Sequence, residues 1–223
     1  MRGRKTLRSA TRTGLEGAAL VVFAKAPQPG RVKTRLVPLL GEHAAARLHA
    51  RMIEDTLRLA AQARFARTEL HCTPHALHRI FATLARRYSL TLRTQGRGDL
   101  GARMLRACER VLRTSKTVVL IGTDCPVLRV ADLRAAVRAL QGGADAVFSP
   151  AEDGGYALIG LRRVSPRLFS GIEWGSSSVL GQTRVRLREL GWRWRELRVV
   201  WDVDRPDDYT RLRRLRAQRH PRR

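Results

Sequence analysis

The sequence is poor in cysteine, in aromatic residues and in acidic residues, and it contains no long apolar run. Its three cysteines form no CxxC pair, so neither a disulfide framework nor a zinc site is indicated. Aromatic residues make up 5% of the chain, which is too few to alternate with basic residues as base-stacking platforms. No apolar segment reaches membrane-spanning length, and none follows the basic N-terminus as in a signal peptide. We therefore expect a cytoplasmic protein in a reducing environment.

Positive charge is in large excess. The 223 residues include 44 Lys and Arg against 19 Asp and Glu, a formal net charge of +25. Much of the excess lies at the two ends, so we predict basic tails at residues 1–17 and 213–223 around one domain at residues 18–212. The other arginines are scattered along helical stretches, which argues against nucleic acid as the principal ligand. Contact between the N-terminal tail and an anionic membrane surface stays open.

Short apolar runs alternate with helical patterns along most of the chain. Strands are expected at residues 18–24, 68–73, 89–94, 117–122, 144–149 and 156–161, and around 197–201. Helices are expected at residues 42–64, 75–87, 100–113, 131–141, 179–190 and 207–218. This alternation predicts an α/β fold with a mainly parallel central sheet covered by helices on both faces. Ligands of such sheets bind beyond the carboxyl ends of the strands, so the residues that follow each strand are the functional candidates.

The first expected strand is followed by the loop AKAPQPGRVKTRL, which concentrates positive charge. Its cations are Lys25, Arg31, Lys33 and Arg35, and Gly30 would let the backbone approach a ligand. The loop is not a Walker A motif because the required glycine spacing is missing. A nucleotide di- or triphosphate has the several negative charges that such a loop suits. A solvated basic turn is the alternative on composition alone.

The segment QGRGDLGARM follows the third expected strand and contains a glycine-rich pattern. Gly96, Gly98 and Gly101 spell G-x-G-x-x-G before a helix, and Asp124 stands about twenty residues further on. This pattern is the dinucleotide-binding fingerprint, but it normally occupies the first strand-to-helix turn of its fold. Asp99 would also oppose a phosphate there. An NAD(P)-binding oxidoreductase is therefore a remote alternative, and a turn that shapes a pocket is preferred.

The fourth expected strand runs into GTDCPVL. A buried strand would bring Asp124 to its carboxyl end, where one carboxylate oxygen can bind a divalent cation. Asp124 is too far upstream to cap the next helix. Cys125 is expected to be a packed thiol rather than a nucleophile, because no His or Asn arrangement supports nucleophilic catalysis.

Two further segments place carboxylates next to strands. In SPAEDGGYALIGL, Asp153 could contact sugar hydroxyls, a metal-bound water or an acceptor, although Asp-Gly is also an ordinary hairpin-turn signal. In VVWDVDRPDDY, Asp207 and Asp208 fit the first turn of a helix. Asp202 and Asp204 lack such an explanation, so they could supply the second carboxylate of a metal site.

Taken in order, these segments resemble the bacterial DUF2064 family of small GT-A-type transferases, also called radical-SAM/selenodomain-associated transferase 1. The resemblance rests on FAKAPQPGRVKTRL, QGRGDLGARM, IGTDCPVL, PAEDGGYALIGL and WDVDRPDDY, and it covers roughly residues 20–212. It implies a single Rossmann-like GT-A domain related to the nucleotide-diphospho-sugar transferases. It also implies a nucleotide or nucleotide sugar bound over the first strands, and Mg²⁺ or Mn²⁺ as cofactor.

The resemblance implies roles for individual residues. The nucleotide-binding residues would be Lys25, Gly30, Arg31, Lys33, Arg35, Gly96 and Asp99. Asp124 would be the metal aspartate. The segment DVDRPDD is similar to the ending of sugar nucleotidyltransferases, which makes Asp204 the second metal ligand, with Arg205 where threonine is common.

The transferred group is left open between two reactions. The family name favours glycosyl transfer from a nucleotide sugar to a small-molecule acceptor, with Asp124 and Asp153 as catalytic residues and Asp153 as the acceptor-side base. However, Asp124 is followed by Cys-Pro instead of completing an Asp-x-Asp, and the opening loop also resembles the phospholactate guanylyltransferases. The alternative is therefore a nucleotidyltransferase that joins an NMP to a phosphorylated small molecule and releases pyrophosphate. We favour glycosyl transfer because the family match spans the whole chain.

Overall fold

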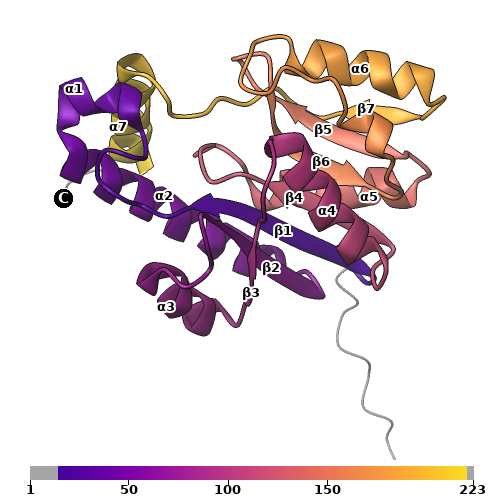
Figure 1. Cartoon of the computed structure of the whole chain (residues 1–223), viewed down its shortest axis with the longest axis horizontal. Helices are drawn as coiled ribbons and strands as arrows, with labels where there is room; N and C mark the ends of the chain where they lie inside the picture. Colours follow the sequence, from indigo (N-terminus) through magenta and orange to yellow (C-terminus); the bar gives the residue numbers. More distant parts are fainter. Residues whose placement is uncertain (1–14, 220–223) are drawn as a thin grey trace, which may run out of the picture.

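The computed structural model describes residues 15–219, which form one mixed seven-stranded sheet with helices on both faces (Figure 1). The strands are β1 (Ala18–Lys25), β2 (Arg67–Thr73), β3 (Thr91–Thr94), β4 (Thr117–Ile121), β5 (Ala146–Pro150), β6 (Tyr156–Leu161) and β7 (Trp194–Glu196). Their order in the sheet is β3-β2-β1-β4-β6-β5-β7, and β6 runs antiparallel to both β4 and β5. The other neighbouring pairs are parallel, which confirms the predicted α/β fold.

Each predicted helix is present, although the helix predicted from residue 75 begins at Arg79, and the short helix Val37–Leu40 was not predicted. The helices are α1 (Val37–Leu40), α2 (Glu42–Ala63), α3 (Arg79–Tyr88), α4 (Leu100–Leu112), α5 (Val130–Gln141), α6 (Val179–Glu189) and α7 (Pro206–Arg219), with 3-10 turns η1 (Thr34–Leu36) and η2 (Pro166–Leu168). Helix α7 continues to Arg219, past the predicted domain limit at residue 212. Only positions 1–14 and 220–223 of the predicted tails lie outside the described residues, since α7 includes residues 213–219. Among the helices of residues 15–219, none is long and apolar enough to cross a membrane.

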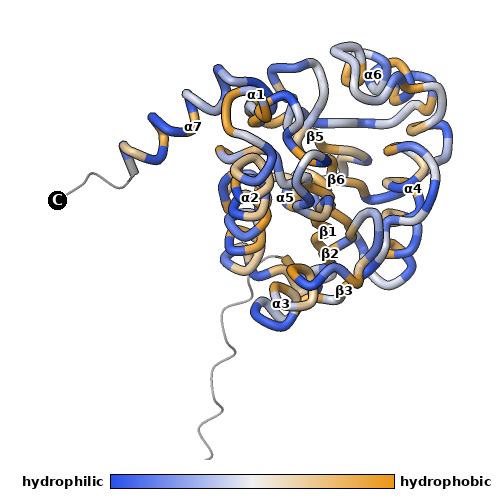
Figure 2. Tube along the Cα trace, turned by 60° about the vertical axis from the view of Figure 1, so that its left-hand side comes forward, coloured by the Kyte–Doolittle hydropathy of each residue, from blue (hydrophilic) through white to orange (hydrophobic). Residues whose placement is uncertain are grey.

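Two apolar layers enclose the sheet because successive side chains of a strand point to opposite faces. From β1, Leu20 packs into the layer built with α2, α3 and α5, whereas Val21 packs into the layer built with α4 and α6. The side chains of β1 are buried on both faces up to Lys25, as expected for a central strand. Figure 2 shows apolar strands in the interior and hydrophilic stretches on the outer helices.

The chain reverses direction across the sheet between β1 and β4. From β1 it proceeds to β2 and β3 on one side, and it then returns to β4 on the other side of β1, with Val22 opposite Ile121. The carboxyl ends of β1 and β4 therefore adjoin at a topological switch point. Ligands of doubly wound folds bind in the crevice at this point. The fold thus brings the loop after Lys25 next to the segment Gly122–Asp124.

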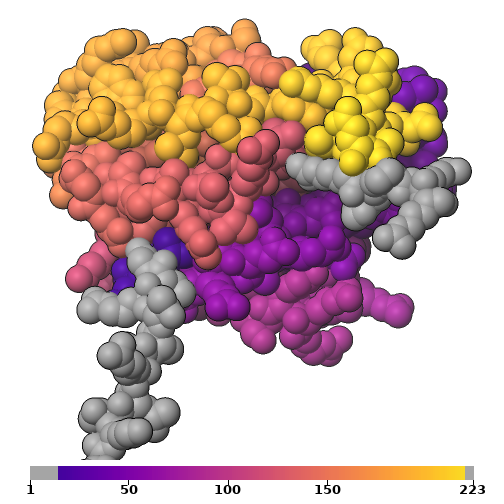
Figure 3. All heavy atoms as spheres, turned by 180° about the vertical axis from the view of Figure 1, so that it is seen from behind, coloured from indigo at the N-terminus to yellow at the C-terminus, as the bar shows by residue number. Residues whose placement is uncertain are grey.

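The C-terminal segment crosses this crevice and packs against the early part of the chain. The Val203 N–H donates to the Asp124 carbonyl at 2.9 Å. Leu212 of α7 then joins a small apolar cluster with Leu36 and Met52. Figure 3 shows α7, in yellow, beside the purple residues of the first helices. The end of the chain therefore holds the loop that follows β1.

The position predicted for the last strand, residues 197–201, was wrong. The regular strand is Trp194–Glu196, which pairs in parallel with β5. Beyond it, Leu197 and Val200 donate single hydrogen bonds to β5, and one isolated bridge joins Val200 to Ala151. The apolar residues at 197–201 predicted a strand. In the structure, Val200 and Trp201 are buried against the core without regular strand pairing.

Candidate active site

The loop after β1 presents cations toward the crevice. Gly30 has φ 71°, and Lys33 has φ 49°, so the loop turns twice through the left-handed region before η1 begins. Lys25 and Arg31 are exposed, and neither has an ion-pair partner within residues 15–219. Arg35 is also exposed and donates to the Asp204 carboxylate. The loop therefore keeps cations available for a ligand.

Lys33 joins the loop to the predicted metal aspartate. Its ammonium group donates to Asp124 Oδ1 at 2.5 Å and to the Val203 carbonyl at 2.6 Å. The Lys33 side chain is 5% exposed, and a lysine this deeply buried needs such partners. The Asp124 side chain remains 49% exposed, so its carboxylate can still meet a ligand. Two residues predicted from separate motifs thus form one direct contact.

His49 of α2 is part of this centre, although its sequence pattern indicated no function. Its Nε2 lies 3.0 Å from the Lys25 carbonyl, which can only accept, so this nitrogen carries the proton. Its Nδ1 faces Asp124 Oδ1 at 3.7 Å. Burial lowers the pKa of His49, and the nearby Asp124 carboxylate offsets this effect only in part. A polar residue among the buried positions of α2 was the one signal that could have identified it.

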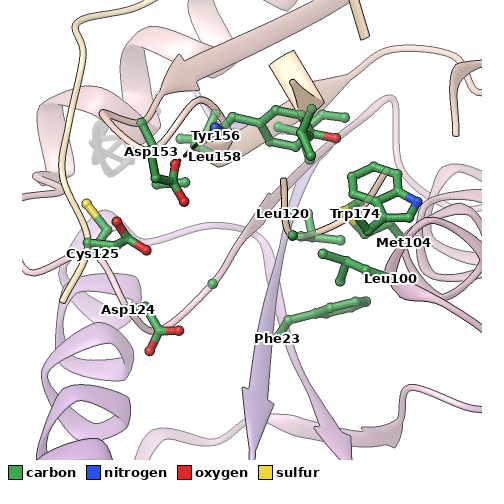
Figure 4. Close-up of a pocket in the computed structure, with 18 of the residues that line it drawn as sticks. Phe23, Leu100, Met104, Leu120, Asp124, Cys125, Asp153, Tyr156, Leu158 and Trp174 are labelled. Atoms are coloured by element: carbon green, nitrogen blue, oxygen red, sulfur yellow. Dashed lines mark hydrogen bonds between the residues drawn. The ribbon is translucent and has the colours of Figure 1, made fainter. Parts of the chain in front are cut away.

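A pocket of about 270 Å³ opens beside Asp124, at the ends of β4 and β6 (Figure 4). One end is acidic and contains Asp124, Asp153 and Asp202. The other end is apolar, and its large side chains come from Phe23, Leu100, Met104, Leu120, Tyr156, Leu158, Ile159, Trp174 and Val179. No lysine or arginine is among the lining residues, all of which lie within the described part of the chain. The pocket therefore differs in charge from the adjoining cationic loop.

The acidic end places Asp202, rather than Asp204, beside Asp124. Burial, followed by repulsion from Asp153 and Asp124, raises the pKa of Asp202 to about 6. Asp204 is not among the lining residues, and its carboxylate pairs with Arg35. Asp204 also donates its N–H to Asp208 Oδ2 at 3.0 Å, which orients it at the start of α7. Of the two candidates in DVDRP, Asp202 is thus the one that lines the pocket.

Asp153 lies in the tight turn between β5 and β6. Its Oδ1 accepts from the Gly155 N–H at 2.9 Å, as in an ordinary turn, and its exposed side chain also lines the pocket. The neighbouring Gly154 has φ 88° and accepts from the Leu180 N–H at 2.9 Å. The turn is therefore tied to the start of α6. The hairpin and functional interpretations of this segment are compatible.

The residues fit a divalent cation only as partial ligands. Within residues 15–219, no three His, Cys, Asp or Glu side chains converge on one point that could hold a metal. Mg²⁺ commonly takes one or two protein carboxylates and completes its coordination with water and substrate phosphates. Burial is the main cause of the raised pKa of Asp202, with repulsion from Asp153 and Asp124 adding to it, and a cation bound beside Asp202 would favour its charged form. Asp124 and Asp202 fit this kind of site.

The glycine-rich segment caps α4 through Asp99 and contributes Leu100 and Met104 to the pocket wall. Asp99 caps the helix by accepting the Ala102 N–H at 2.7 Å, which gives it a structural role. Gly96 and Asp99 do not line the pocket, and Gly101 lies directly against Trp174. The segment also follows β3 at the edge of the sheet instead of β1. This location is unlike that of the dinucleotide-binding fingerprint.

Cysteine chemistry is disfavoured at the site. Cys125 lines the pocket, but burial raises the pKa of its thiol to about 11. The thiolate is the reactive form of cysteine, and little of it would exist at neutral pH. Burial likewise raises the pKa of Cys72 and Cys108 to about 12. Cys125 therefore acts as a small packed side chain.

Several solved structures share this fold. A protein from Desulfovibrio desulfuricans G20, provisionally assigned to the nucleotide-diphospho-sugar transferases, is 31% identical, with a TM-score of 0.77 over 85% of this chain and 83% of its own. The 4-diphosphocytidyl-2C-methyl-D-erythritol synthase of Anaerococcus prevotii is 9% identical, with a TM-score of 0.62 over 92% of this chain and 99% of its own. Glucosyl-3-phosphoglycerate synthase of Mycobacterium tuberculosis, crystallised with Mn²⁺ and UDP, is 13% identical, with a TM-score of 0.55 over 92% and 81%. The likeness to the Desulfovibrio protein places the chain with the GT-A-type transferases, whereas the other two likenesses concern the fold alone.

The family within this class follows from the sequence. Residues 56–176, more than half of the chain, match the family described as an uncharacterized protein conserved in bacteria (DUF2064). The protein belongs to the DUF2064 family, which confirms the resemblance found in its motifs. A comparison with curated proteins found no match.

Proposed function

We propose that the protein transfers a glycosyl group from a nucleotide sugar to a small-molecule acceptor and requires Mg²⁺ or Mn²⁺. The observation that supports this most directly is the contact between Lys33 and Asp124 at the switch point between β1 and β4. It unites a cation-rich loop with a carboxylate suited to a divalent cation. A nucleoside diphosphate group has the charge and size that this junction suits.

The loop would hold the diphosphate of the donor. Lys25, Arg31 and Arg35 are exposed on the loop and can approach phosphate oxygens. Negative charge grows on the diphosphate as its bond to the sugar breaks. Cations already in place stabilise that developing charge more in the transition state than in the ground state, which accelerates the reaction.

Asp124 and Asp202 would hold the divalent cation from the pocket side. When bound, the cation would add positive charge next to the leaving diphosphate. Asp204 lies behind them and orients Arg35. His49 would hold α2 against the end of β1 through its hydrogen bond to the Lys25 carbonyl.

Asp153 would act as the acceptor-side base. Its carboxylate lines the same pocket as Asp124, and its turn is held by hydrogen bonds at Gly154 and Gly155. A carboxylate positioned by a rigid turn can take the proton of an attacking hydroxyl group. This assignment follows the acceptor-side role expected from the sequence.

Nucleotidyl transfer is the second candidate. It is favoured by one feature, the single aspartate of GTDCP, which lacks the second carboxylate of an Asp-x-Asp. The fold is also shared with a cytidylyltransferase of Leptospira borgpetersenii, although at 12% identity this concerns the fold alone. That reaction would release pyrophosphate and would need cations around the acceptor phosphate.

The decisive experiment identifies the released product. Purified protein would be incubated with Mg²⁺ or Mn²⁺ and either a panel of nucleotide sugars or a panel of NTPs, together with a pool of small alcohols and phosphorylated compounds. We expect nucleoside diphosphate from at least one nucleotide sugar, and no pyrophosphate. Pyrophosphate release from an NTP would instead establish nucleotidyl transfer. Asp124→Asn is the control variant, and it should abolish the metal-dependent signal.

A further inference from the structure

A second cleft, of about 280 Å³, lies between α2 and α7. Its lining residues come from the end of α1, from α2 and from α7, and it shares none of them with the pocket beside Asp124. Figure 1 shows α1 and α7 next to each other above α2. The transfer reaction proposed above makes no use of this cleft.

The floor of the cleft is apolar and well packed. Leu48 of α2 is 7% exposed and Leu212 of α7 is 2% exposed, and both belong to the apolar cluster that contains Leu36. Tyr209 of α7 packs against the same cluster. Because these side chains join the two helices, the backbone positions around the cleft are fixed by the fold.

Four arginines line the cleft, two from each helix. Arg47 and Arg51 are one turn apart on α2, and Arg213 and Arg216 are three residues apart on α7, so each pair projects from one face of its helix. No Asp or Glu is among the lining residues, all of which belong to the described part of the chain. Like charges at this spacing repel each other. We refer to this feature as the arginine cleft.

The carboxylates on the neighbouring turns do not neutralise the arginine cleft. Arg216 lies 3.1 Å from Asp55, but Asp55 also lies 3.4 Å from Arg58. Glu54 is paired with Arg87 of α3. Within residues 15–219, the side chains of the other three lining arginines form no ion pair and no hydrogen bond. The cleft therefore keeps an excess of positive charge after its neighbours are counted.

We propose that the arginine cleft is a binding site for a phosphate monoester group, separate from the site of the transfer reaction. A guanidinium group is planar and donates paired hydrogen bonds that match two phosphate oxygens. Three arginines without partners suit the roughly two negative charges of a phosphate monoester at neutral pH better than the single charge of a carboxylate. The hydroxyl group of Tyr209 forms no hydrogen bond within the described residues, so it can donate to a further oxygen.

A bound phosphate group would hold α7 against α2. It would offset the repulsion within each pair of arginines and would contact side chains of both helices at once. Helix α7 follows directly on Val203, whose carbonyl accepts from Lys33. Binding should therefore also steady the segment that closes over the crevice. The proposal is independent of the proposed function, because the cleft requires neither a metal nor a nucleotide.

Hydrogen exchange of the full chain locates the binding site. The probe is phenyl phosphate, added without metal. We expect amide exchange to slow in peptides from α2 and α7, because a ligand that binds the folded state stabilises the elements it joins. Slower exchange confined to the loop that follows β1 would overturn the proposal, since it would show that the cationic loop alone binds phosphate.

A pair of substitutions tests the arginines directly. Arg47→Gln combined with Arg213→Gln removes one guanidinium group from each helix, and both residues are exposed. Arg86→Gln combined with Arg138→Gln is the control pair, because it removes the same charge from exposed positions on α3 and α5. We expect the cleft pair to weaken binding of phenyl phosphate, measured by calorimetry, at least about tenfold, and the control pair to change it less than about twofold. Equal losses in both pairs would refute the arginine cleft.

Vesicle binding then distinguishes the two sources of the phosphate group. The group belongs either to a soluble phosphorylated molecule or to a lipid headgroup, and vesicles of phosphatidylcholine with and without phosphatidic acid provide the second. Binding to phosphatidic acid that falls further in the cleft pair than in the control pair would assign a lipid headgroup. Equal vesicle binding in the two pairs, together with the selective loss of phenyl phosphate binding, would assign a soluble ligand. Equal behaviour of the pairs in both assays would overturn the proposal.

Discussion

A buried lysine and three carboxylates govern the electrostatics of the site. Lys33 is almost completely buried and depends on Asp124 and the Val203 carbonyl to balance its charge. Removing the partner of a buried charge is generally more costly than the pair itself is stabilising. Asp124→Ala would therefore affect folding as well as catalysis. Asp124→Asn keeps the shape and a hydrogen-bond acceptor, so it is the cleaner substitution.

Comparison of Asp202→Asn with Asp204→Asn separates the two candidates for the second metal ligand. We expect Asp202→Asn to weaken metal-dependent nucleotide binding by roughly a hundredfold, because Asp202 lines the pocket. Asp204→Asn should have a smaller effect, because its carboxylate pairs with Arg35. Calorimetric titration of a nucleoside diphosphate with Mn²⁺ would measure both.

Titrations without metal are the control for these two variants. Asp204→Asn would alter metal-free binding through Arg35, whereas Asp202→Asn would leave it nearly unchanged. A larger loss of metal-dependent binding in Asp204→Asn would support Asp204 as the second metal ligand, as predicted from the DVDRPDD motif. It would contradict the assignment of Asp202, which rests on the pocket lining.

The turn between β5 and β6 connects the site to α6. Gly154 has φ 88°, and a Cβ atom placed there would lie 2.0 Å from the Ser177 carbonyl oxygen. No side chain fits between these two backbone segments. The closeness explains why the glycines follow Asp153, since the turn must pass beneath the start of α6. The position of Asp153 thus depends on backbone packing between β6 and α6.

Gly154→Ala tests this connection. We expect a loss of about 3 kcal/mol or more in the free energy of unfolding, because the backbone must shift as well as strain. Gly175→Ala is the matched control. Gly175 has φ 89° but has no atom within 4 Å of an added Cβ, so only the backbone strain of about 1–2 kcal/mol applies. Urea denaturation of both variants measures the difference, and equal losses would show that steric packing at Gly154 is unimportant.

The excess of positive charge makes each buried carboxylate important for stability. Asp145 stands just before β5, and its carboxylate accepts from Arg162 at 2.6 Å and from the Arg193 N–H at 3.0 Å. Arg163 lies 3.1 Å from the same carboxylate. Burial alone would raise the pKa of Asp145, but the Arg162, Arg193 and Arg163 groups outweigh it and lower the pKa. This residue therefore joins three strands of a highly cationic protein.

The lowered pKa of Asp145 predicts a pH-dependent contribution to stability. A carboxylate with a depressed pKa in the folded state stabilises the protein above its unfolded pKa of about 4, and this stabilisation is lost as the pH falls through the folded value. Asp145→Asn should therefore lower the free energy of unfolding by about 1–3 kcal/mol at pH 7, and by less at pH 3. Urea denaturation at both pH values measures the two differences.

Asp55→Asn is the matched control for this prediction. Asp55 pairs with Arg216, but its side chain is 49% exposed, so its removal should cost no more than about 1 kcal/mol. A loss in Asp145→Asn that is the same at pH 3 and pH 7 would show that its shape, and not its charge, matters.

Local sequence patterns predicted most helices and strands of the fold, with small errors in their bounds. The helix predicted at residues 42–64 is Glu42–Ala63, because its amphipathic repeat is long and its ends are marked by turn conformations. The last strand was misplaced because burial of single residues, without regular pairing, produces the same apolar pattern. The short helices η1 and α1 were not predicted, since their few residues carry no periodic signal.

Some of the candidate site residues could be predicted from the sequence. Motifs after strands predicted Lys33, Asp124 and Asp153 as candidate site residues. The structure brings Lys33 into contact with Asp124 and places Asp153 on the pocket that Asp124 also lines, because parallel strands bring their carboxyl ends to one edge of the sheet. His49 was missed because a polar residue on the apolar face of α2 was its only signal, and Trp174 was missed because its position depends on how the segment before α6 packs. Asp99 was expected at the nucleotide, but its carboxylate caps α4.

The order of strands and helices, the cationic loop and the family of this protein are properties of local amino-acid patterns, because periodicity and motifs need only neighbouring residues. The chain order of the motifs, however, carries no distances between them. Packing between distant segments decides the contact of Lys33 with Asp124. It also decides that Asp202, and not Asp204, lines the pocket, and that no lysine or arginine of the described residues does so. Groups separated by up to 170 residues meet there because the sheet reverses at β1 and β4 and the C-terminal segment closes over that point.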